Sequence, residues 1–227
     1  MKTYRELKEG LQDPHIFKAF FLAGGPGSGK SYVVGYSTGG TGLRVVNPDP
    51  MFEKLLDQAG LDKKMPPEEH VPREKQLARA KELTAAQRRN YIMGRIGMVI
   101  DGTGKDYDKI RTDKAKLEQL GYDTHMIFVN TSLDVALARN ADRPRSVPED
   151  TAIMSWKQVQ GNIGQFQQLF KGNFVIVDNN KKDDKIEAMT FKAVKRLLNK
   201  KVKNRRAYEW VRMEMQRRGI TKPPKFL

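Results

Sequence analysis

The sequence predicts an α/β fold of three layers, in which helices cover both faces of a five-stranded, mostly parallel β-sheet. Short apolar runs alternate along the chain with longer segments of helical periodicity, a pattern typical of parallel sheets with crossover helices. The first apolar run leads into a glycine-rich loop and then a helix. A chain of 227 residues is long enough for one such domain with an appendage.

The expected elements follow in chain order. Apolar runs predict strands at Ile16–Ala23, Leu43–Asn47, Met98–Ile100, His125–Val129 and Phe174–Val177. Helical periodicity predicts helices at Lys30–Tyr36, Pro50–Ala59, Arg73–Ile96, Tyr107–Leu120, Leu133–Asn140, Glu149–Phe170, Lys185–Asn199 and Arg205–Arg217.

The loop after the first strand, Gly24-Gly25-Pro26-Gly27-Ser28-Gly29-Lys30-Ser31, matches the phosphate-binding pattern GxxxxGK[ST] at every fixed position. Glycines let consecutive backbone N–H groups face the phosphates of a nucleoside triphosphate, and the following helix adds its positive end. We therefore expect ATP as the ligand, with Mg²⁺ bound by the Ser31 hydroxyl. The residues expected to contact the nucleotide are Gly25, Pro26, Gly27, Ser28, Gly29, Lys30 and Ser31.

Two carboxylates follow strands and so belong to the sheet edge where ligands of open α/β folds bind. Asp49 comes after the second strand, and Asp101 after the third, two residues before Thr103. Asp49 is a candidate general base for an attacking hydroxyl, although capping of the next helix would also explain it. Asp101 and Thr103 are placed near the metal or the acceptor. No glutamate follows Asp101 to activate water, which favours transfer to a bound hydroxyl.

Arginines cluster between the fourth strand and the helix that begins at Glu149. Arg143 and Arg145 are expected in a short connection between two helices, and Arg139 just before it. Guanidinium groups on such a connection can close over a transferring phosphate and neutralise its charge. The segment 139–150 is therefore predicted to be a lid.

The charge is concentrated at the C-terminal end of the chain. The formal net charge is +15, and the segment 181–227 carries 16 basic and 5 acidic residues. This asymmetry predicts two parts, a domain over 1–180 that carries the glycine-rich loop and a basic helical extension over 181–227, and it favours a polyanionic partner, DNA above all. A solvated surface is the alternative, with Ala207, Trp210 and Val211 docking the last helix on the domain.

Composition also limits location. The sequence contains no cysteine, and its longest apolar run is too short to cross a bilayer. The segment 1–14 carries Glu6, Glu9 and Asp13, which argues against a signal peptide. We expect a cytoplasmic protein, in the host cytoplasm if it is viral, with no membrane partner. The oligomeric state is left open.

Together these motifs resemble the P-loop kinase group that contains polynucleotide 5′-kinases and zeta-toxin kinases. The resemblance spans about 17–179 and rests on GGPGSGKS, the aspartate after strand two, the Asp-Gly-Thr that ends strand three, and Arg-Asn-x-x-Arg before Val-Pro. It implies a P-loop kinase-type three-layer sandwich. It further implies that Asp49 is the general base, Lys30 and Ser31 are phosphate and metal ligands, and Arg143 is the lid arginine. Asp101 and Thr103 fall where acceptor-binding residues lie.

One departure bears on the acceptor. The resembled kinases have an arginine a few residues after the base to hold the acceptor, whereas Met51, Phe52 and Glu53 follow Asp49 here. The set also resembles viral kinases that phosphorylate hydroxymethyl groups on bases within DNA, which would suit a basic surface.

Three alternatives remain open from the sequence. Asp101-Gly102-Thr103-Gly104 and Asn180-Lys181-Lys182-Asp183 match the DxxG and NKxD patterns of a GTP-dependent switch. A kinase of a nucleotide, nucleoside or sugar nucleotide would share the fold. A nucleic-acid-binding module could use the triphosphate only structurally.

The favoured interpretation is a magnesium-dependent ATP:hydroxyl phosphotransferase acting on nucleic acid. Its catalytic residues are Lys30, Asp49 and Arg143, its further nucleotide ligands are Arg139 and Arg145, and its metal ligands are Ser31 and Asp101.

Overall fold

A computed structural model describes residues 10–64, 66–143 and 145–225, and it shows the predicted sheet. All five expected strands are present, with ends that shift by one or two residues. They are β1 (Lys18–Ala23), β2 (Arg44–Val46), β3 (Met98–Asp101), β4 (Asp123–Asn130) and β5 (Phe174–Asp178). The order across the sheet is β2-β3-β1-β4-β5, and every pairing is parallel. The three-layer α/β prediction is confirmed.

The central strand explains why the sheet is covered on both sides. Every residue of β1 is buried. Phe20 and Leu22 face a cluster with Val33 of α1 (Lys30–Thr38) and Val194 of α8 (Asp184–Leu198). Ala19, Phe21 and Ala23 face the opposite cluster, which includes Leu117 of α4 (Tyr107–Gln119), Val159 of α6 (Glu149–Gly161) and Phe166 of α7 (Ile163–Phe170). Alternate residues of one strand therefore anchor helices on both faces, as the pleat requires.

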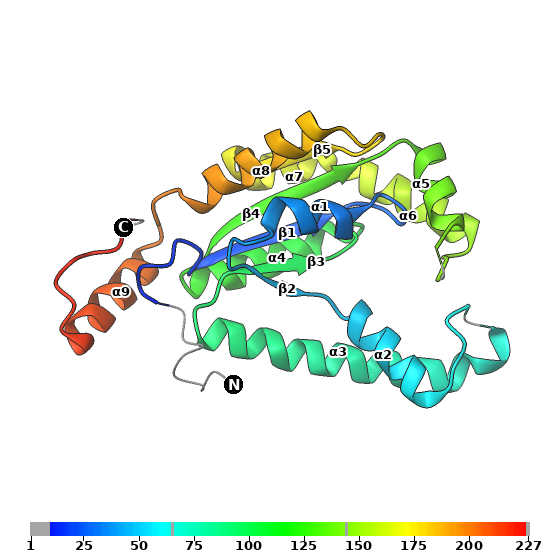
Figure 1. The fold of residues 1–227 in the computed structure, drawn as a ribbon, viewed down its shortest axis with the longest axis horizontal. Coiled ribbons are helices and arrows are strands. Elements are labelled where there is room, and N and C mark those ends of the chain that lie inside the picture. The colour runs from blue at the N-terminus through cyan, green and yellow to red at the C-terminus, as the bar shows by residue number, and fades with distance from the viewer. Residues whose placement is uncertain (1–9, 65, 144, 226–227) are drawn as a thin grey trace.

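Figure 1 shows the helices that cover the sheet and those that extend beyond it. They are α1 (Lys30–Thr38), α2 (Asp49–Ala59), α3 (His70–Met93), α4 (Tyr107–Gln119), α5 (Leu133–Ala141), α6 (Glu149–Gly161), α7 (Ile163–Phe170), α8 (Asp184–Leu198) and α9 (Arg205–Arg218). Two short 3₁₀ turns lie at Pro67–Glu69 and Lys171–Asn173.

The single helix expected over Glu149–Phe170 is wrong, because the structure divides it into α6 and α7 at Asn162. The side chain of Asn162 donates hydrogen bonds to the backbone oxygens of Gly104 and Lys105, each at 3.0 Å. This tertiary contact fixes Asn162 outside both helices, next to the loop that follows β3. Helical periodicity cannot reveal such a contact, because it depends on a segment about sixty residues away.

Helices α2 and α3 form an arm beside the sandwich, seen at the lower right of Figure 1. The arm has its own small core of Phe52, Leu56 and Ala80. Its first helix begins directly after β2, so the start of α2 lies at the carboxyl edge of the sheet. The arm therefore borders the edge at which ligands of this architecture bind.

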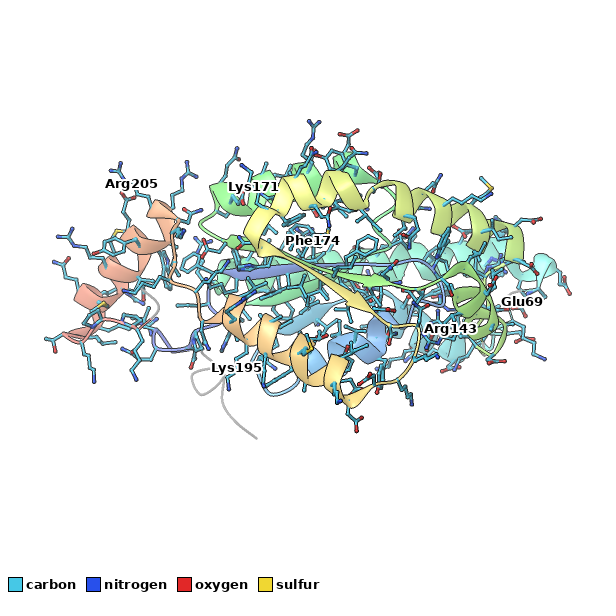
Figure 2. All side chains as sticks on the ribbon, turned by 90° about the horizontal axis from the view of Figure 1, so that it is seen from above. Glu69, Arg143, Lys171, Phe174, Lys195 and Arg205 are labelled. Carbon is cyan, nitrogen blue, oxygen red and sulfur yellow. The ribbon has the colours of Figure 1, made fainter. Side chains whose placement is uncertain are left out.

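Helix α9 of the basic C-terminal extension lies at the other end of the strands, whereas α8 covers the sheet. Trp210 packs edge-on against Phe17, just before β1, with ring centroids 5.3 Å apart. The Asn204 side chain donates to the Glu118 backbone oxygen at 2.6 Å, ahead of β4. Ala207 and Val211 are fully buried, which confirms that this helix docks on the domain. Figures 1 and 2 show α9, with Arg205, at the end of the molecule opposite the lid residue Arg143.

A buried lysine connects the extension to the sheet. The ammonium group of Lys18, with no exposed side-chain surface, donates to Asp123 Oδ2 at 2.8 Å and to the Lys200 backbone oxygen at 2.9 Å. The expected division at residue 180 stays a prediction, although α8, on its C-terminal side, belongs to a layer that covers the sheet. In the part of the chain that the structure describes, no helix has the length and apolarity to cross a bilayer.

Candidate active site

The glycine-rich loop connects β1 to α1, as predicted, and its glycines have conformations that other residues rarely adopt. Gly24, Gly27 and Gly29 have φ values of 155°, 75° and 82°. A Cβ on Gly27 would lie 1.9 Å from the Ala136 backbone oxygen of α5. Glycine is therefore required at this position both for the turn and for the close approach of α5.

Asparagine and arginine side chains support the back of this loop. Asn179, just after β5, donates to the Ser28 backbone oxygen at 2.8 Å. Arg139 in α5 donates to the backbone oxygens of Asn179 at 2.6 Å and Asn180 at 3.2 Å. In this structure Arg139 thus fixes the loop after β5, at the border of the predicted nucleotide site.

Lys30, the first residue of α1, points back along the loop. Its ammonium group donates to the backbone oxygens of Gly24 at 2.7 Å and Gly25 at 3.1 Å. Burial lowers the pKa of Lys30, and the nearby Asp101 carboxylate opposes that change. The positive charge is therefore partly desolvated, and an anion placed at the loop would interact with it strongly.

The two predicted carboxylates meet at the carboxyl edge of the sheet. Asp101 ends β3, and its Oδ2 accepts a hydrogen bond from the Asn47 side chain at 2.7 Å. Burial raises the pKa of Asp101, with Lys30 acting in the opposite direction. Asp49 is the first residue of α2, and its side chain caps nothing, because Pro48 occupies the capping position. The capping explanation of Asp49 is therefore wrong.

The lid arginines lie in the connection 142–148 between α5 and α6, as expected. Arg145 Nη2 lies 3.0 Å from Asp49 Oδ1, and its Nε lies 3.7 Å from Glu53 Oε1. Asn140 holds the end of the connection by exchanging two hydrogen bonds with the backbone of Val147, at 2.7 and 3.1 Å. The lid is thus in contact with the arm across the site.

The loop after β3 carries Thr103 to the same place. The Gly24 backbone N–H donates to the Thr103 backbone oxygen at 2.9 Å, which joins this loop to the glycine-rich loop. The Asn162 contacts described above fix its other side. Thr103 and Asp101 line the same cavity.

One cavity of about 590 Å³ brings most of the predicted residues together. Its lining comes from the glycine-rich loop, the carboxyl edge of the sheet, the start of α2 and the lid: Pro26, Gly27, Gly29, Lys30, Ser31, Asn47, Pro48, Asp49, Asp101, Gly102, Thr103, Arg139, Arg143, Arg145 and Val147. Gly25 and Ser28 belong to the loop but not to this lining. Gly25 packs on Trp156, and the buried Ser28 hydroxyl has no hydrogen-bond partner among the described residues.

The cavity suits a magnesium–nucleotide complex. Among the described residues, no group of three His, Cys, Asp or Glu side chains forms a metal site on its own. Ser31 and Asp101 both line the cavity and offer two oxygen ligands. Mg²⁺ usually takes one or two protein oxygens and completes its shell with phosphates and water. The residues present therefore fit the ion in combination with a nucleotide.

Sequence reasoning missed three asparagines and a tryptophan that position the site. Asn47 orients Asp101, Asn179 supports the loop at Ser28, Asn162 holds the loop after β3, and Trp156 packs on Gly25. Only Asn47 gave a local signal, in the turn sequence Asn-Pro-Asp-Pro. The others act on segments distant in the chain.

The guanine-reading pattern is used for other contacts. Asp183 caps α8 by accepting a hydrogen bond from the Lys185 backbone at 2.8 Å. The Asn180 side chain accepts from the Ser132 backbone at 2.8 Å and donates to Asp178 Oδ1. Both side chains that would read a guanine base are thus engaged in local structure.

The fold and the glycine-rich loop with its lid define a P-loop kinase-type protein. The sequence model of the zeta toxin family matches residues 2–188, so the chain belongs to that family. No curated protein matches the chain significantly.

Solved structures share the fold at low identity. A structure from the PezAT chromosomal toxin–antitoxin system of Streptococcus pneumoniae is 13% identical, with a TM-score of 0.54 over 86% of this chain and 90% of that one. A gluconokinase from Sinorhizobium meliloti is 17% identical, with a TM-score of 0.48 over 81% and 95%. A deoxyadenosine kinase from M. mycoides with bound dATP is 18% identical, with a TM-score of 0.44 over 78% and 99%.

Proposed function

We propose that this protein is a magnesium-dependent ATP:hydroxyl phosphotransferase whose acceptor is a small molecule such as a nucleotide, a nucleoside or a sugar nucleotide. One observation carries the proposal: a single cavity brings together a phosphate-binding loop with its lysine, a carboxylate that caps no helix, and lid arginines. Membership of the zeta toxin family supports a kinase activity.

Each side chain then has a defined task. The loop N–H groups and Lys30 bind the outer phosphates of ATP, and Arg143 covers the group being transferred. The acceptor oxygen forms a bond to the γ-phosphorus, the bond to the ADP oxygen breaks, and the acceptor proton passes to Asp49. Catalysis on this scheme consists of alignment and charge neutralisation.

Magnesium fits the same arrangement, with Ser31 and Asp101 as its protein ligands. Held by these residues, the ion would supply neutralisation of the charge that develops during transfer. Burial raises the pKa of Asp101, and a bound cation would oppose that effect.

The cavity favours a small acceptor. Its volume lies within the range of small-molecule sites, and its walls come from both the lid and α2. Within the basic extension, which was expected to hold a polymer, α9 docks at the opposite end of the strands. The basic residues of α9 therefore do not lie next to the reacting groups, as binding of a polymeric acceptor by α9 would require.

A nucleic acid is the second candidate acceptor. The strong positive charge of 181–227 supports it, since backbone phosphates are attracted to such surfaces whatever their sequence. A strand end reaching the cavity would not need the extension for chemistry.

The test is phosphate transfer from labelled ATP to a panel of acceptors. The panel includes nucleosides, nucleotides, sugar nucleotides, single-stranded DNA, duplex DNA and RNA, each with and without Mg²⁺. Labelled product from a small acceptor, dependent on Mg²⁺ and lost in Lys30→Met, supports the proposal. Labelling of polynucleotides alone would establish the second candidate, and GTP hydrolysis without any acceptor would contradict both.

A further inference from the structure

Arg145 joins two parts of the site, the lid connection and helix α2. It lies in the lid connection, and its guanidinium group contacts Asp49 Oδ1 at 3.0 Å and Glu53 Oε1 at 3.7 Å. The same group lies over the Phe52 ring, 5.5 Å from its centroid. Two carboxylates and an aromatic face of α2 thus surround one lid arginine.

The burial of the three side chains is unequal. Arg145 is 16% exposed, whereas Asp49 and Glu53 are 50% and 43% exposed. Arg145 and Asp49 line the cavity, but Glu53 does not. Glu53 therefore acts on the cavity through the arginine that it contacts.

The arm that carries these carboxylates contacts the lid through Arg145. Its core of Phe52, Leu56 and Ala80 is separate from the two clusters that cover the sheet. The lid connection is held at its own end by Asn140. The contact of Arg145 with α2 therefore sets how closely the arm and the lid approach over the cavity.

Glu53 also resolves a conflict at Asp49. A guanidinium group held by Asp49 alone would compete with the acceptor hydroxyl for that carboxylate. Glu53 lies one helical turn further along α2, on the same side, and holds the same guanidinium from a second direction. Arg145 contacts Asp49 through Oδ1, and the Asp49 side chain is 50% exposed, so the carboxylate stays accessible to the acceptor.

We propose that Glu53 is a positioning residue that retains Arg145 on α2, keeps the lid closed over the cavity and leaves Asp49 free to accept the acceptor proton. The catalytic part of this inference rests on the proposed function. The lid part does not, because closure can be measured without ATP or acceptor.

The experiment measures hydrogen exchange by mass spectrometry in peptides that cover residues 142–148. It compares the wild type with Glu53→Gln, Arg145→Gln, the double variant, and Glu74→Gln as a control. Glu74 is an exposed glutamate on α3 of the same arm. We expect each of the first two substitutions to speed exchange about two- to fivefold, as for the loss of a partly exposed ion pair.

The double variant decides whether the two residues act as a unit. If Glu53 acts through Arg145, exchange in the double variant matches that of Arg145→Gln, and Glu74→Gln matches the wild type. Wild-type exchange in Glu53→Gln, or effects that multiply in the double variant, would overturn the proposal.

Kinetics separate positioning from a merely structural contact. With an acceptor that the panel identifies, Glu53→Gln is expected to raise the acceptor KM severalfold and leave the ATP KM within about twofold. An unchanged acceptor KM beside faster exchange would refute the positioning role. Absence of transfer in the wild type would instead count against the proposed function, and the exchange result would still decide the lid contact.

Discussion

At the scale of single residues, Lys30 is the clearest test of the donor site. Its ammonium group contacts only loop carbonyls among the described residues, so the core does not depend on it. Lys30→Met keeps the aliphatic stem and removes the charge. We expect transfer to fall by about 10²- to 10³-fold with little change in melting temperature. Transfer rates and thermal unfolding check this, with the exposed Lys54 of α2, replaced in Lys54→Met, as the control. Retained transfer would remove Lys30 from the donor site.

Asp49 is expected to act in the chemical step. Asp49→Asn keeps the size of the side chain but removes the proton acceptor, so kcat should fall about 10²- to 10⁴-fold while ATP binding changes little. Steady-state kinetics and ATP titration test this, with Asp57→Asn on the same helix as the control. Because Asp49 caps nothing, a large loss of stability with normal turnover is not expected, and observing it would contradict the assignment.

His125 sets a pH dependence of stability far from the active site. It is buried on β4 against the Phe20 ring, and neither ring nitrogen has a hydrogen-bond partner among the described residues. Burial, with Lys18 and Lys200 nearby, lowers the pKa of His125 to about 3. Between about pH 6.5 and pH 3 the unfolded chain binds this proton and the folded chain does not, so the free energy of unfolding decreases as the pH falls through that range.

His125→Phe removes this titration and keeps the ring contact. We expect the variant to lose less stability than the wild type between pH 8 and pH 5, as measured by chemical denaturation at both values. The slope for one such proton is at most about 1.4 kcal/mol per pH unit. Equal losses in the two proteins would show that His125 is protonated in the fold or unimportant to it.

At the scale of elements, the docking of α9 depends on its apolar face. Trp210 contacts Phe17, whereas Tyr208 on the same helix is 52% exposed. We expect Trp210→Ala to lower the free energy of unfolding by about 2–3 kcal/mol, and Tyr208→Ala to change it by less than about 0.5 kcal/mol. Urea denaturation of both variants measures the difference. Equal effects would mean that α9 does not depend on this contact.

Elements and side-chain networks differ in how far the sequence predicts them. Strands such as β1 and β4 are apolar runs, because they are buried on both faces, and the loop at Gly24–Ser31 has a fixed spacing set by phosphate chemistry. Local sequence patterns therefore predicted the position of every strand and of the whole glycine-rich loop. The break at Asn162 and the contact of Arg145 with Asp49 depend on segments that meet only in the fold. They leave no periodic signal, and they were missed.

At the scale of the whole molecule, the basic helix α9 and the cavity lie at opposite ends. The eight residues of β4 separate the two ends by about 26 Å, at roughly 3.3 Å per residue, whereas the Debye length at physiological salt is about 8 Å. The charge of α9 is therefore screened from the cavity, which lies beyond the carboxyl ends of the strands. Binding of a polyanion at α9 and turnover of a small acceptor are expected to be independent.

The final prediction tests that independence with the triple variant Lys201→Gln, Lys203→Gln, Arg212→Gln. All three side chains are exposed in or near α9. The control removes three exposed charges from α3, as Lys75→Gln, Lys81→Gln, Arg89→Gln.

Binding of single-stranded DNA should weaken in the first variant only, and the slope of log affinity against log salt should become shallower by about 2. Transfer to a small acceptor should keep its kcat/KM in both variants. If instead the first variant raised the KM for a DNA acceptor, the extension would deliver the substrate. The two ends of the molecule would then act together, and the second candidate function would replace the first.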